Sequence, residues 1–229
     1  MQALIVGVGP GISASFARLL AREGYAVALA ARNVDKLAAL AGETGATTHA
    51  CDVADAAQVA ALFAAIPAPD VVLFNASQRV RGPIAELDPD AVARALAVAA
   101  FGGFLVGREA ARTMLARGSG LARGSGTILF TGASASVKGY PLSASFAMGK
   151  FALRGLAQSM ARELHPKGIH VAHLVIDGGV RSASRTEAAT APDSLLDPDG
   201  IATAMLALIR QPRSAWTDEL ALRPWVEPF

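Results

Sequence analysis

Small residues near the N-terminus could bind a phosphate group. They are Gly7, Gly9, Gly11, Ile12 and Ser13. This turn follows an apolar, β-branched segment, Ala3 to Val8, and precedes a helix-forming run that ends at Arg22. Glycine suits such a turn because a pyrophosphate can approach backbone N–H groups where no Cβ intervenes, and the helix directs its positive end at the anion. A tight turn without a ligand is the alternative, but the strand before and the helix after favour a dinucleotide site.

The glycine spacing fits two dinucleotide-binding patterns. Read from Gly9, the residues follow G-x-G-x-x-A, and read from Gly7 they follow G-x-x-x-G-x-S. Each pattern alone is weak evidence, so the rest of the chain must support it.

The second expected strand, Tyr25 to Ala31, ends beside a residue that can discriminate between cofactors. About twenty residues after a glycine turn, an acidic side chain would bind the ribose 2′-hydroxyl of NAD. This chain has Arg32 at that point, after the small Ala31. A planar guanidinium accommodates a 2′-phosphate, so the pattern predicts NADP(H) in preference to NAD(H). The alternative is that Arg32 caps the next helix or lies in solvent.

Small and polar residues also follow two other expected strands. Asp52 and Val53 come after the third strand, and Asn75 and Ala76 come after the fourth. Ligands of parallel sheets bind beyond the carboxyl ends of the strands, so these residues are candidates to line an adenine or a ribose. Ordinary turn chemistry is the alternative.

The segment from Gly126 to His173 contains the candidate catalytic residues. A strand ending at Thr131 is followed by Ser134, and Lys150 then lies on an expected helix. Tyr140 lies in the loop between them, where it could donate a proton or simply cover the pocket. A desolvated Lys150 could itself act as an acid.

Taken together, the glycine turn, Asp52, Asn75-Ala76, Lys150 and Asp177-Gly178 resemble the short-chain dehydrogenase/reductase family over nearly the whole chain. The resemblance implies a Rossmann-like fold, NAD(P)(H) binding and hydride transfer. In that family a tyrosine four residues before a lysine is the acid/base, and the lysine holds the nicotinamide ribose and lowers the tyrosine pKa. A serine orients the substrate carbonyl, and a helix asparagine positions a proton-relay water. The resemblance also implies that Gly178 and Ser182 bind the cofactor.

This chain departs from the family pattern at the positions that transfer a proton. Lys150 matches the lysine, but the tyrosine position is Phe146, the serine position is Ala133 and the asparagine position is Ala99. A phenyl ring cannot exchange a proton, and a positioned general acid contributes roughly 10²–10⁴ in rate. One hypothesis is an atypical oxidoreductase acting on a small carbonyl or alcohol, with the proton drawn from Ser134, a loop tyrosine or water. The other is a non-catalytic dinucleotide-binding sensor or scaffold.

The elements that must position these residues alternate between strand and helix. Expected strands are Ala3 to Val8, Tyr25 to Ala31, Ala46 to Cys51, Val71 to Asn75, Thr127 to Thr131, Ile169 to Ile176 and Glu219 to Leu222. Each is a continuous apolar run, as strands covered on both faces should be. The pattern predicts an α/β fold, a doubly wound parallel sheet (Rossmann-like) forming a single domain over residues 1–229.

Composition bounds the partners and the compartment. The net charge is +2 with only 17% charged residues, so the sequence pI near 9.0 does not indicate nucleic-acid binding. With 52% hydrophobic residues, the chain is expected to bury helix faces in a homodimer or homotetramer.

The single cysteine, Cys51, is expected to be buried and suits a reducing cytoplasm. We expect no targeting segment and no membrane span, because the longest uncharged apolar stretch, Ala95 to Gly107, is short. The histidines lack metal-ligand spacing, so no metal is expected.

A six-residue segment is repeated in tandem. Leu115 to Gly120 and Leu121 to Gly126 both read LARGSG. A Gly- and Ser-rich copy before a strand is typical of a tolerated loop insertion, and we assign it no function.

Overall fold

Seven parallel strands form the centre of the structure, a computed structural model that describes residues 1–117 and 124–227. The strands are β1 (Gln2–Val6), β2 (Ala26–Ala31), β3 (Thr47–Ala50), β4 (Val71–Phe74), β5 (Gly126–Thr131), β6 (Ile169–Ile176) and β7 (Glu219–Leu222). Their order in the sheet is β3-β2-β1-β4-β5-β6-β7, so the direction of winding reverses between β1 and β4. This confirms the predicted doubly wound sheet and places its switch point beside the glycine turn.

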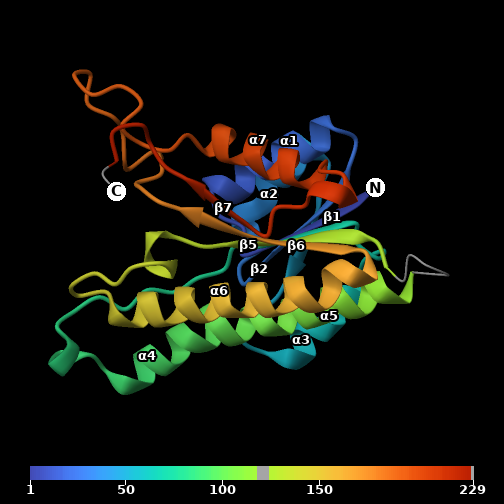
Figure 1. The fold of residues 1–229 in the computed structure, drawn as a ribbon, viewed down its shortest axis with the longest axis horizontal. Coiled ribbons are helices and arrows are strands. Elements are labelled where there is room, and N and C mark those ends of the chain that lie inside the picture. The colour runs from blue at the N-terminus through green and yellow to red at the C-terminus, as the bar shows by residue number, and fades with distance from the viewer. Residues whose placement is uncertain (118–123, 228–229) are drawn as a thin grey trace.

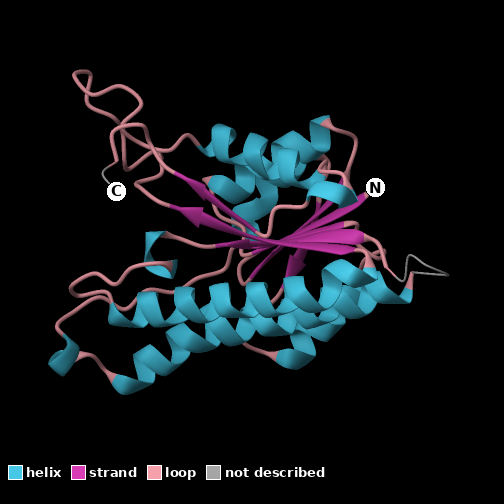
Figure 2. Ribbon diagram, in the orientation of Figure 1, coloured by secondary structure: helices cyan, strands magenta, loops and turns pink. Residues whose placement is uncertain are grey.

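Helices cover both faces of the sheet. α1 (Ile12–Arg22), α2 (Ala38–Thr44) and α7 (Pro198–Ile209) lie on one face, and α3 (Ala56–Ala65), α4 (Pro89–Leu96), α5 (Gly102–Ala116) and α6 (Ala144–Leu164) lie on the other (Figures 1 and 2). Two buried apolar clusters match these layers, one containing Phe74 and Phe130 and the other containing Phe16. Successive strand residues point to opposite faces, so two covered faces require the continuous apolar runs seen in the sequence.

Aspartates fix the starts of three helices. The side chains of Asp55, Asp88 and Asp197 accept hydrogen bonds from backbone N–H groups in the first turns of α3, α4 and α7. Proline follows Asp88 and Asp197, where its missing N–H costs nothing. These caps fix where each helix begins and therefore where the preceding loop must end.

Three expected strands ran past the observed sheet edge. Val8, Cys51 and Asn75 lie outside β1, β3 and β4, whose last residues are Val6, Ala50 and Phe74. All three of these residues line a pocket at the carboxyl ends of the strands instead. The physical reason is that the chain must leave the ladder to make room for that pocket.

A continuous helical run extends over Pro89–Ala116 and comprises α4, a π-helical turn η3 (Ala97–Phe101) and α5. Among the described residues it is the one helix long and apolar enough to cross a membrane, by length and composition only. It packs along α3 and α6 on one face of the sheet (Figure 1), as the core helix of a soluble protein also does.

Half of the LARGSG repeat, residues 118–123, lies outside the described residues. On its near side, Arg117 ends α5 and pairs with Asp70, with 2.7 Å between Nη1 and Oδ1.

Candidate functional site

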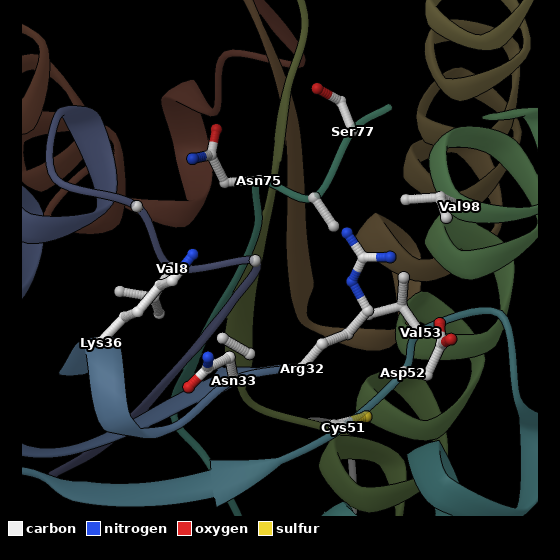
Figure 3. Close-up of a pocket in the computed structure, with 14 residues that line it drawn as sticks. Val8, Arg32, Asn33, Lys36, Cys51, Asp52, Val53, Asn75, Ser77 and Val98 are labelled. Atoms are coloured by element: carbon white, nitrogen blue, oxygen red, sulfur yellow. The ribbon is translucent and has the colours of Figure 1, made fainter. Parts of the chain in front are cut away.

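Two adjoining pockets lie at the switch point of the sheet, with volumes of about 410 Å³ and 220 Å³. Gly9 and Asn75 line both of them. The larger pocket, drawn in Figure 3, gathers the predicted residues Gly7, Gly9, Arg32, Asp52, Val53, Asn75 and Ala76. The smaller gathers Gly9, Gly11, Ile12, Ser13, Asn75 and Ser182. The two pockets thus bring together every predicted cofactor residue except Lys150 and Gly178.

The three glycines of the turn have different structural roles. Gly7 has a φ of +82°, and a Cβ there would lie 2.3 Å from the backbone nitrogen of Ala76. Gly7 therefore lets the turn pack against the end of β4. A Cβ on Gly9 or Gly11 would meet nothing within 4 Å, so the space before α1 is open to a ligand. Helix α1 begins there with no side-chain cap and no acidic residue in its first turn, which suits an anion.

Ser13 ties the turn to the neighbouring strand. Its hydroxyl donates to the Gly7 carbonyl at 3.3 Å and accepts from Asn75 Nδ2 at 2.7 Å. Ser13 is fully buried. The hydrogen bonds hold the glycine turn and the end of β4 in a fixed relation, which shapes both pockets.

Two cations follow β2 in the larger pocket. Arg32 and Lys36 both line it, and Figure 3 shows both side chains among its lining residues. Asn33 Oδ1 accepts from Asp35 N at 3.0 Å, which starts the short helix η1 (Asp35–Leu37) and turns Lys36 back toward the pocket. The side chain that accepts from the first residue of η1 is thus that of Asn33 and not of Arg32. Sequence reasoning missed Lys36, although a second cation four residues after Arg32 was a signal.

Lys150, on α6, is buried beside the end of β5. Its side chain is 4% exposed, and Nζ donates to the Thr131 carbonyl at 2.6 Å. Burial, and then the positive charge of Arg79, lowers the pKa of Lys150 to about 8. Phe146 precedes it by one turn of α6, and Nζ lies 5.7 Å from the ring centroid.

Helix α6 brings the remaining family positions to this lysine. Gly149 lets α6 approach η3, because a Cβ there would lie 2.9 Å from the Cβ of Ala99. Ala99 is buried in the π-helical turn. Ala133 follows β5, and its backbone N–H donates to Ser136 Oγ at 3.1 Å. The side chains at positions 99, 133 and 146 carry no proton donor, as the sequence indicated.

The other predicted residues have mixed placements. Ser134 begins a short helix η4 (Ser134–Ser136), and its carbonyl accepts from Lys138 N at 3.1 Å. Tyr140 is 44% exposed in the following loop, where Lys138 Nζ lies 5.8 Å from its ring centroid. Gly178 has a φ of +151°, and a Cβ there would lie 2.7 Å from Pro224 Cδ, so this glycine accommodates the C-terminal segment.

The buried thiol and histidine near the sheet are poor reactive groups. Burial, followed by the charges of Asp52 and Asp55, raises the pKa of Cys51 to about 11, so the thiol stays protonated at neutral pH. Cys51 is 2% exposed, as expected from the sequence. Burial lowers the pKa of His173 to about 4, so that ring is neutral. Residues 1–117 and 124–227 contain no group of three His, Cys, Asp or Glu side chains that could hold a metal.

A doubly wound sheet with an open glycine turn at its switch point defines a Rossmann-like dinucleotide-binding domain. The family model for short chain dehydrogenase matches residues 1–192. The chain therefore belongs to the short-chain dehydrogenase family of oxidoreductases.

Individual relatives agree with this assignment. A solved short-chain dehydrogenase from Rhodopseudomonas palustris is 38% identical, with a TM-score of 0.83 and 98% of each chain covered. A metagenomic short-chain oxidoreductase solved in complex with NADP is 28% identical, with a TM-score of 0.83, covering 99% of this chain and 98% of that one. Human 17-beta-hydroxysteroid dehydrogenase type 1 is 34% identical over 134 residues, which are 58% of this chain and 39% of the human protein.

Proposed function

We propose that this protein binds NADP(H) in preference to NAD(H) and transfers a hydride between the nicotinamide and a small carbonyl or alcohol. The observation that carries the cofactor preference is the pair Arg32 and Lys36 in one pocket, with no acidic residue at the end of β2. Two cations there suit the 2′-phosphate that distinguishes the two cofactors. The NADP complex of the metagenomic relative supports the same choice.

In the proposed hydride transfer, separate residues bind the cofactor and exchange the proton. The open turn at Gly9 and Gly11 and the start of α1 bind the pyrophosphate. Lys150 donates hydrogen bonds to the nicotinamide ribose, and a bound nicotinamide would supply or accept the hydride. Ser134, Tyr140 or water exchanges the proton with the substrate oxygen.

Replacement of Arg32 or Lys36 by alanine should weaken NADPH binding about 10-fold each, and the double replacement about 100-fold, because each removes about 1.4 kcal/mol of phosphate binding. NADH binding should stay unchanged. Fluorescence titration of both cofactors gives the dissociation constants. Arg22→Ala, in the last turn of α1, is the matched control and should change neither. Equal NADPH and NADH affinities in the unaltered protein would contradict the assignment.

One observation favours a second function, a non-catalytic dinucleotide-binding sensor or scaffold. Phe146 stands one turn before Lys150, where the family has its acid/base tyrosine. Such a protein would bind NADPH with the same preference but would not turn over carbonyl substrates. Steady-state turnover with a panel of small aldehydes and ketones separates the two functions.

We also propose that the protein is a cytoplasmic homodimer or homotetramer with no nucleic-acid or membrane partner. Phe101 and Phe104 near the start of α5, and Met148 and Phe151 on α6, are each 45–52% exposed. These two helices pack against each other, so the exposed apolar side chains lie on one helical layer. Large apolar side chains left in water favour association.

Substitution of Phe101 and Phe151 together by serine should convert the oligomer into a monomer, because it removes two aromatic groups from the proposed interface. Light scattering should then give a mass near 23.4 kDa, against a multiple of that mass for the unaltered protein. A mass of 23.4 kDa for the unaltered protein at micromolar concentration would contradict the proposal. Trp225→Ser, at the exposed C-terminal segment, should leave the mass of the assembly unchanged.

A further inference from the structure

One arginine side chain, Arg79, lies over the ring of Phe146 without an acidic partner. The guanidinium carbon of Arg79 lies 3.9 Å from the Phe146 ring centroid. Partial desolvation lowers the pKa of Arg79, and the nearby charges of Arg185 and Arg81 lower it further. Within the described part of the chain, no ion pair joins Arg79, Arg81 or Arg185 to a carboxylate. The charge of Arg79 also lowers the pKa of Lys150, after the larger effect of burial.

Hydrogen bonds fix the Arg79 loop on α6. Ser145 is buried, and its hydroxyl donates to the Val80 carbonyl at 2.8 Å and accepts from Val80 N at 3.2 Å. Gly82 N donates to the Leu142 carbonyl at 3.2 Å. The loop that carries Arg79 is therefore tied to α6 through Ser145, the residue before Phe146. This helix also carries Lys150.

Arg185 comes from a different segment and links this region to the cofactor pocket. Its backbone exchanges two hydrogen bonds with Ser182, at 2.9 Å and 3.1 Å. Ser182 lines the smaller pocket beside the glycine turn. A Cβ on Gly179 would lie 3.3 Å from Arg185 Nη1, so glycine leaves space for this guanidinium.

Like charges held close together destabilise the fold unless an anion binds between them. The stacking of a guanidinium on an aromatic ring orients its fork without using its hydrogen-bond donors. Those donors match a carboxylate or a phosphate. Arg79 lies over the ring that precedes Lys150 by one helical turn, and Arg185 is hydrogen-bonded through its backbone to Ser182 of the smaller pocket.

We infer that the substrate carries an anionic group, a carboxylate or phosphate, bound by Arg79 with Arg185. The assignment of this anionic group to the substrate rests on the proposed oxidoreductase function. Phe146 then supports the arginine that positions the substrate. The substitution of the family tyrosine thus accompanies a change in what the pocket recognises.

Benzoate and its neutral analogue benzamide test the site directly. Isothermal titration calorimetry should show benzoate binding at least 10-fold more tightly than benzamide, with or without NADP⁺ present. Arg79→Ala and Arg185→Ala should each weaken benzoate binding about 10-fold and leave benzamide unchanged. Arg79→Lys keeps the charge but loses the planar fork, so its benzoate affinity should lie between those of the unaltered protein and of Arg79→Ala. Arg162→Ala, at the far end of α6, is the control and should have no effect.

Turnover supplies the matching functional readout. With NADPH, 4-formylbenzoate should have a kcat/KM at least 10-fold above that of 4-formylbenzamide, and Arg79→Ala should remove the difference. Equal binding of benzoate and benzamide would overturn the inference. So would an Arg79→Ala variant that loses NADPH affinity but keeps benzoate affinity, since Arg79 would then bind the cofactor.

The two proposals fail in different ways. Absence of NADPH binding would overturn the proposed function, while benzoate binding in the cofactor-free protein would still report on the arginines. If Arg79→Ala does not fold by circular dichroism, Arg79→Gln and the salt dependence of benzoate binding replace it. An affinity that does not fall with added salt would count against an ionic contact.

Discussion

Substitution of Phe146 by tyrosine should raise carbonyl reduction by roughly 10²–10⁴-fold, the contribution typical of a positioned general acid. The new phenol would stand one helical turn from Lys150, whose Nζ lies 5.7 Å from the present ring centroid. A neighbouring cation favours the phenolate and so lowers the pKa of the tyrosine from its usual value near 10. NADPH oxidation with a small aldehyde measures the change. Phe151→Tyr, on the exposed side of the same helix, keeps an aromatic ring at the proposed interface and adds a phenol away from the lysine, so turnover should stay unchanged.

The gain should grow when the neighbouring family position is restored. Ala133→Ser added to Phe146→Tyr should increase turnover more than additively, because residues that act as a unit are not independent. If the unaltered protein already turns over briskly and Phe146→Tyr slows it, another group is the acid. Tyr140→Phe would then identify whether the loop tyrosine is that group.

Substitution of Lys150 by methionine should stabilise the cofactor-free protein while it weakens cofactor binding. Burial lowers the pKa of Lys150 from 10.5 to about 8, a penalty of about 3 kcal/mol for keeping it charged at neutral pH. Loss of the hydrogen bond to the Thr131 carbonyl offsets about 1 kcal/mol of this gain in stability. The free energy of unfolding should therefore rise by about 2 kcal/mol at pH 7, measured by urea denaturation.

The effect should depend on pH in a definite direction. The unfolded chain binds the lysine proton more tightly than the folded one, so the penalty is complete below pH 8 and fades between about pH 8 and 10.5. The advantage of Lys150→Met should accordingly be largely lost at pH 10. Lys167→Met, at a half-buried lysine paired with Glu163, should show no such difference at either pH.

Cofactor affinity gives the functional half of this prediction. Lys150→Met should weaken NADPH binding at least 10-fold, because a charged hydrogen-bond donor to the ribose is worth about 1.5–3 kcal/mol. In the unaltered protein, NADPH affinity should decline as the pH rises through about 8, where the free amine loses its proton. A variant that is less stable than the unaltered protein at pH 7, yet binds NADPH equally well, would contradict both halves.

The sequence by itself determined the order of elements and the chemistry of their ends. Continuous apolar runs predicted the five inner strands, whereas the edge strands β3 (Thr47–Ala50) and β7 (Glu219–Leu222) are only partly apolar and were predicted from the alternation of strand and helix. Aspartate before proline predicted the starts of α4 and α7. These signals are local, because hydrophobic period and capping act within a few residues. That phenylalanine rather than tyrosine stands four residues before Lys150 was equally visible, since it depends only on spacing in the sequence.

The tertiary structure alone decided which distant residues meet. Gly7 packs against Ala76, while the space beside Gly9 is open. The spacing of the glycines in the sequence does not predict this difference. Lys150 is buried beside the end of β5, and the charge of Arg79 from a distant loop lowers its pKa further. The placement of Arg79 over Phe146, fixed through Ser145, is likewise a product of packing between separate segments. Side-chain convergence of this kind follows from how the layers pack, and no local propensity encodes it.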